Sequence, residues 1–233
     1  MATLHKPLSV ILRVWSAAED ILRNRPSGEA PAHVHWKRAL LLIILFGSCY
    51  GALMGTFGGI AGERLLQVLY SALKVPLLLV FTFVVALPSF FVLNTLLGVR
   101  SDFSAVLTAL ISTQAGLTVL LLSFAPDTLF WYASFSDYDA AILFNAFVFG
   151  VAAVAGQWLL RRAYQPLIAK NPRHRVLLRT WLIIYAFVGI QSAWVLRPFI
   201  GSPEMTVQFF RQEAWGNAYV EIAQKARGLL SRK

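Results

Sequence analysis

The chain has 233 residues, of which 58% are hydrophobic and only 14% are charged. This composition excludes an ordinary soluble domain, because so much apolar surface must face lipid. The formal net charge of +10 does not indicate a nucleic-acid partner, since lysine and arginine lie beside the apolar segments rather than in a separate basic domain. We therefore expect an integral membrane protein that contacts the lipid bilayer and binds no nucleic acid.

Residues 1–38 precede the apolar segments and form the first predicted region. From Pro7 to Arg23, apolar side chains recur on one face at the 3.6-residue period of a helix, and polar side chains occupy the other face. Residues 1–38 contain no unbroken apolar stretch followed by a small-residue cleavage pattern, so we expect no secretory signal peptide. This cytoplasmic N-terminal region is predicted to carry an amphipathic helix on the membrane surface or docked on the bundle.

Five apolar segments are predicted to cross the membrane, at about residues 39–61, 75–98, 103–125, 140–160 and 176–196. Four of them exceed the roughly 18 apolar residues that a span needs. The fifth is counted from Val176, because the long side chain of Arg179 can reach back to the interface. The fold class is therefore all-α, a polytopic transmembrane helical bundle over residues 39–197 with amphipathic interfacial helices at both ends.

Basic residues set the predicted orientation, because cytoplasmic loops carry more lysine and arginine than external ones. The only basic residues of the first external loop are Arg64 and Lys74. The second external loop has no basic residue and holds Asp127, Asp137 and Asp139 instead. We expect a bacterial inner (plasma) membrane with the N-terminus in the cytoplasm. The basic C-terminal tail leaves a second topology open, in which the fifth segment enters the membrane and returns on the same side.

The first predicted span contains glycines at intervals of four residues: Gly47, Gly51, Gly55 and Gly59. Such glycines form a flat helix face that lets another backbone approach closely. We predict a helix-packing face there. A partner protein or a second copy would fit it, but the preferred interpretation is contact with this chain's own fourth span, which offers small residues at Ala146, Gly150, Ala152 and Gly156.

The second predicted span contains two prolines, Pro76 at its expected start and Pro88 in its middle, where a kink is expected. The C-terminal tail, residues 198–233, is predicted to contain a second amphipathic helix from about Gln212 to Leu230. Its narrow apolar stripe is predicted to dock on a partner or on the membrane interface through Trp215, Tyr219, Ile222 and Leu229.

Side chains that carry chemistry are sparse. The four longest predicted spans contain no Asp, Glu, Lys, Arg or His, which argues against an ion-coupled transporter. Cys49 is the single cysteine, and His33 and His35 have no third ligand nearby, so we expect no metal site. Catalytic and phosphate-binding motifs are absent, so we expect neither an enzyme nor a cofactor.

The predicted five-span arrangement, the short N-terminal region and the proline-containing second span, Lys74 to Leu97, resemble the Yip family of five-span membrane proteins. The Asp-Leu-Tyr-Gly-Pro tract of that family is absent from this chain. The resemblance implies a membrane adaptor in trafficking or assembly, with no catalytic residues.

The leading hypothesis is a noncatalytic integral membrane subunit or adaptor that packs with partner membrane proteins or with itself. The alternative is a small oligomeric channel or transporter for an uncharged or weakly selected solute. Such a pathway would be lined by uncharged polar residues such as Asn94, Gln114 and Asn145.

Overall fold

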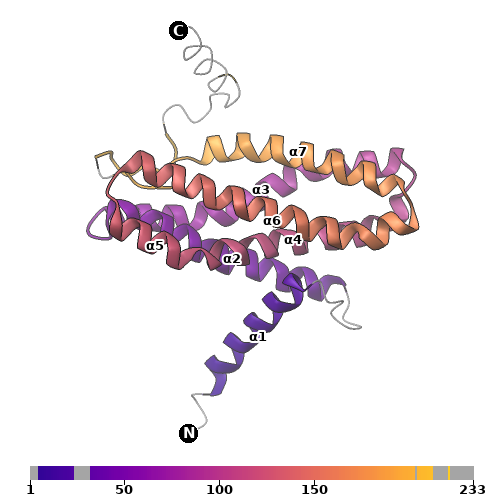
Figure 1. Ribbon diagram of the computed structural model, residues 1–233, viewed down its shortest axis with the longest axis horizontal. Helices are drawn as coiled ribbons and strands as arrows, with labels where there is room; N and C mark the ends of the chain where they lie inside the picture. The colour runs from indigo at the N-terminus through magenta and orange to yellow at the C-terminus, as the bar shows by residue number, and fades with distance from the viewer. Residues whose placement is uncertain (1–4, 24–31, 203, 212–219, 221–233) are drawn as a thin grey trace.

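The computed structural model describes residues 5–23, 32–202, 204–211 and 220. The regular elements of this part of the chain are helices: α1 (His5–Leu22), α2 (Ala32–Gly55), α3 (Arg64–Leu96), α4 (Phe103–Ser123), α5 (Ala125–Ser134), α6 (Tyr138–Lys170) and α7 (Arg173–Leu196). Two short 3₁₀ turns, η1 (Thr56–Gly58) and η2 (Arg100–Asp102), connect them. Figure 1 shows α2, α3, α4, α6 and α7 running alongside one another in one elongated bundle.

Five helical stretches are long and apolar enough to cross a membrane: Trp36–Gly58, Arg64–Leu96, Arg100–Ser134, Tyr138–Lys170 and His174–Leu196. The predicted multi-pass all-α bundle is confirmed. The fifth stretch contains α7, a continuous helix of 24 residues. At 1.5 Å per residue it is about 36 Å long, enough to cross a hydrocarbon core of about 30 Å. It does not enter and return as the second predicted topology requires.

Two helices extend well beyond the predicted spans. The α3 helix begins at Arg64, so the predicted external loop is helical and Pro76 lies inside the helix rather than at its start. The α6 helix continues through Pro166 to Lys170, which shortens the predicted loop before α7 to Asn171 and Pro172. Hydropathy identifies only the apolar part of a membrane helix. A helix can extend beyond that part through polar residues when neighbouring segments pack against its ends.

Three of the four predicted packing glycines lie against α3, which is the second span and not the fourth. A Cβ atom on Gly51 would overlap the carbonyl oxygen of Ser71, and one on Gly55 would lie 2.6 Å from the Cα atom of Val68. One on Gly47 would lie 3.4 Å from the backbone nitrogen of Pro76. The expected contact with the fourth span is therefore wrong, and these glycines bring α2 and α3 together instead.

Gly59 does not belong to this face. The α2 helix ends at Gly55, and the 3₁₀ turn that follows breaks the four-residue register of an α-helix. Gly59 adopts φ 102°, which only glycine adopts readily, and a Cβ atom there would meet nothing within 4 Å. Its role is to turn the chain after α2.

The bundle keeps its interior between the helices and an apolar exterior toward lipid. One cluster of buried side chains joins α3, α4, α6 and α7 around Phe90, Leu110, Tyr164 and Trp181. The predicted N-terminal helix is present as α1, and its Ala18 is buried against α2 and α4 while Trp15 is exposed. Figure 1 shows the first turns of α1 projecting away from the bundle.

Candidate functional site

Residues 197–202 and 204–211, which we call the strap, follow α7 without forming a helix or strand. Backbone carbonyls outside regular structure need hydrogen-bond donors when they are covered. The strap obtains these donors from side chains of α3 and α6. It lies at the end of the bundle where α3 and α6 begin, which we call the Lys74 end.

One face of α3 supplies most of these donors. Arg64, Gln67, Ser71 and Lys74 follow one another at spacings of three, four and three, which places them on the same side of a helix. Ser71 Oγ donates to the carbonyl of Phe199, and Gln67 Nε2 donates to Ser71 Oγ at 3.1 Å. This polar face was not identified from the sequence, although its spacing was readable there.

Arg64 ties down the middle of the strap. Its Nη1 atom donates to the carbonyls of Ser202 at 2.6 Å and Met205 at 3.0 Å. The Tyr138 hydroxyl, from the start of α6, donates to the carbonyl of Ile200 at 3.3 Å. The strap is therefore held from two helices that are far apart in the sequence.

Lys74 is fully buried, which corrects its predicted place in an external loop. Its Nζ atom donates to the carbonyl of Pro198 at 2.7 Å and lies 4.8 Å from the centre of the Phe209 ring. A buried ammonium needs such partners, because taking the charge out of water costs free energy. The sequence predicts a loop at Lys74 because no neighbouring residue indicates that the strap covers this lysine.

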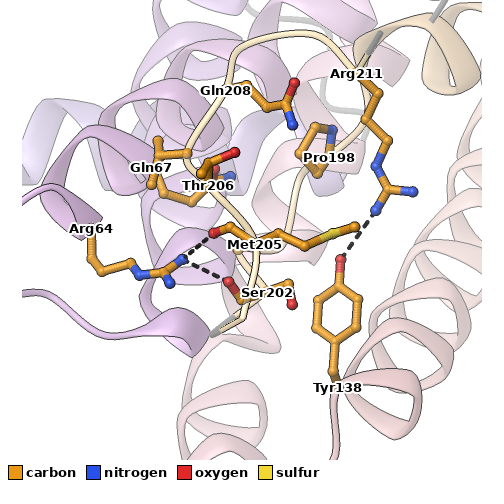
Figure 2. Close-up of a pocket in the computed structure, with 11 residues that line it drawn as sticks. Arg64, Gln67, Tyr138, Pro198, Ser202, Met205, Thr206, Gln208 and Arg211 are labelled. Atoms are coloured by element: carbon orange, nitrogen blue, oxygen red, sulfur yellow. Dashed lines mark hydrogen bonds between the residues drawn. The ribbon is translucent and has the colours of Figure 1, made fainter. Parts of the chain in front are cut away.

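A cavity of about 260 Å³ lies between the strap and the starts of α3 and α6. Figure 2 shows the side chains of Arg64 and Arg211 entering it from opposite sides. Arg211 Nη2 lies 3.5 Å from the Tyr138 hydroxyl. Guanidinium groups donate hydrogen bonds and accept none, so this lining favours an anion over a metal cation.

A second polar group lies near the same end and joins α2, α5 and α6. Tyr50 donates to Asn145 Oδ1 at 3.2 Å, and Asn145 Nδ2 donates to the Tyr132 hydroxyl at 2.7 Å. The Tyr50 hydroxyl also lies 3.5 Å from Thr128 Oγ1. Asn145 therefore connects helices within one chain.

The other polar residues singled out in the sequence are buried as well. Gln114 Oε1, on α4, accepts from the Tyr185 hydroxyl of α7 at 2.8 Å. Asn94 Nδ2 donates to the carbonyl of Phe90 in its own helix at 3.1 Å.

Cys49 is exposed on the outer side of α2. The predicted docking residues of the tail, Trp215, Tyr219, Ile222 and Leu229, lie outside the described residues.

Comparison with known proteins finds no matching family model, no matching curated protein and no matching solved structure.

Proposed function

We propose that this chain is a noncatalytic integral membrane subunit or adaptor that packs with partner membrane proteins. The observation that carries the proposal is that the interior polar side chains form hydrogen bonds within the chain. Asn145 and Gln114 each bond to tyrosines on other helices, and Asn94 bonds to its own backbone. Side chains that bond across helices, as Asn145 and Gln114 do, hold those helices in fixed positions.

The same observation weighs against the channel alternative. Asn94, Gln114 and Asn145 are at most 6% exposed. A pathway formed by oligomerisation would need polar side chains on the outer surface, where copies of the chain meet. Instead, the outer surface is dominated by large apolar side chains such as Leu143, Phe147 and Ile183.

The outward side of α6 is the surface that we assign to a partner helix. Ala146 and Gly150 are exposed there, four residues apart, and a Cβ atom on Gly150 would meet nothing within 4 Å. Glycine weakens an isolated helix by about 1 kcal/mol relative to alanine, but it lets a second helix approach closely. Leu143 and Phe147 flank this pair and would add apolar contact area.

The resemblance to the Yip family supports the same class of role, a membrane adaptor in trafficking or assembly. The excess of basic residues in the predicted cytoplasmic segments supports an N-terminus on the cytoplasmic side, and we propose a bacterial inner membrane as its place.

The proposal is tested by purifying the chain from native membranes in mild detergent and measuring the mass of the complex by light scattering. We expect an assembly heavier than one chain of 25.9 kDa, with its other subunit identified by mass spectrometry. Gly150→Leu should reduce recovery of that subunit about tenfold, because a large side chain separates the helices.

Cys49→Leu is the matched control, since Cys49 is exposed on the outer side of another helix. It should leave the assembly unchanged. Purification of the chain without any other subunit, together with solute flux through it in reconstituted liposomes, would refute the adaptor role in favour of the channel.

A further inference from the structure

The charged side chains that line the cavity at the Lys74 end are all positive. Arg64 and Arg211 line it, and no acidic residue is among its lining residues in the part of the chain that the structure describes. The acidic residues that flank its lining residues in the sequence, Glu63, Asp137, Asp139 and Glu204, are exposed and do not line it. The cavity therefore presents hydrogen-bond donors and positive charge.

A third cation lies behind the strap. Lys74 Nζ donates to the carbonyl of Pro198, and Pro198 lines the cavity together with Arg211. Among the described residues, neither Lys74 nor Arg211 forms an ion pair with a carboxylate. Like charges held together in a partly desolvated place raise the energy of the folded state, and a bound anion would lower it.

An apolar groove of about 450 Å³ opens between α3 and α7 on the side that faces lipid. Leu77, Phe81 and Val85 line it from α3, and these residues continue the helix face that carries Lys74 at spacings of three and four. Phe210 of the strap lines the groove, whereas the next residue, Arg211, lines the cavity. The groove and the cavity are thus lined by adjacent residues of the strap.

We propose that the Lys74 end binds an anionic phospholipid, with its phosphate in the cavity between Arg64 and Arg211 and an acyl chain in the groove. The sizes agree with this division. The cavity is smaller than the roughly 300 to 1,000 Å³ of pockets that enclose a whole drug-sized ligand, so it suits a headgroup alone. Basic pockets between membrane helices bind anionic headgroups on the cytoplasmic side, and this cavity, external in the proposed orientation, offers the same hydrogen-bond donors.

A lipid fits better than a free anion for two reasons. The five candidate spans place the bundle in a bilayer, where phospholipid is the most abundant phosphate-bearing molecule beside the cavity. The groove also supplies an apolar surface that a free anion would not use. The site is independent of the proposed adaptor role, because Ala146 and Gly150 line neither the cavity nor the groove.

Native mass spectrometry of the full chain tests the proposal, with phosphatidylglycerol and phosphatidylcholine of identical acyl chains as probes. We expect retention of phosphatidylglycerol at least about tenfold stronger than that of phosphatidylcholine. Arg211→Gln should weaken phosphatidylglycerol binding about tenfold, since one charge-assisted hydrogen bond is lost. Arg211→Lys should retain part of the binding.

The matched control is Arg175→Gln, which removes an exposed arginine at the opposite end of the bundle and should change nothing. Val85→Trp fills the groove and should weaken lipid binding without touching the cavity. Equal retention of the two lipids by the unaltered chain would overturn the proposal, and this comparison holds even if a variant fails to fold. Displacement of the lipid by inorganic phosphate at equal concentration would overturn the lipid assignment and leave a site for free anions.

Discussion

The charged side chains at the two ends of the bundle have different kinds of partner. At the end opposite Lys74, the Asp102 carboxylate lies 2.5 Å from Lys170 Nζ and 3.1 Å from His174 Nε2. These residues come from the α3–α4 connection, the last turn of α6 and the first turn of α7. We call this the Asp102 end. Asp102 and Lys170, which carry opposite charges, join two of these segments.

At the Lys74 end, the partners of the cations Lys74 and Arg64 include neutral backbone carbonyls of the strap. A carbonyl satisfies the hydrogen bond but does not cancel the charge. The Asp102 end thus fastens helices to one another, whereas the Lys74 end holds a nonhelical segment, with Arg64 and Arg211 lining a cavity beside it. We therefore expect the cavity at the Lys74 end to favour an anion.

The largest effect at the Lys74 end is expected for the substitution Gly51→Leu. The added side chain would push against the Ser71 carbonyl and separate α2 from the face of α3 that holds the strap. We expect a loss of roughly 3 kcal/mol of stability, at the upper range for overpacking, seen as a lower thermal midpoint and folded yield in detergent. Ala52→Leu, one residue away on a partly exposed side, should cost far less. Similar tolerance of both changes would show that the close contact is dispensable.

The five spans were predictable from the sequence because each is a long run of apolar residues. The interval of four between Gly47, Gly51 and Gly55 also predicted a close-packing face. It did not identify the partner, because a glycine face accepts any helix with a compatible surface. Contact with α3 depends on how the helices assemble, and local spacing carries no information about that.

The candidate site was largely missed for a related reason. The sequence predicts a loop at Lys74 because a lysine marks the end of an apolar run, whereas its burial depends on the strap more than 120 residues later in the chain. The spacing from Arg64 to Lys74 did contain a helical signal. That signal would have predicted one polar helix face, but not the carbonyls that it meets.

An intermediate effect is expected for Lys74→Met, which keeps the length of the side chain and removes its charge. The covered carbonyl of Pro198 would lose its donor, at a cost of about 1 to 3 kcal/mol. Hydrogen exchange of backbone amides in residues 199–211 should become faster, because the strap is held less firmly. Lys170→Met is the matched control at the other end, where the lysine side chain is 66% exposed. Unchanged exchange in the strap would contradict a role for Lys74 in holding it.

The smallest effect is expected for Asp102→Asn. The amide can still accept one hydrogen bond, but it no longer balances the charge of Lys170, and His174 keeps a neutral partner at best. Because salt screens charge pairs near the surface, the thermal midpoint of the unaltered chain should fall slightly as salt is added, and the variant should lose part of that dependence. Glu63→Gln, an exposed acid at the Lys74 end, should leave the dependence unchanged. An identical salt response in Asp102→Asn and the unaltered chain would mean that the Asp102 end is held by packing and not by opposite charge.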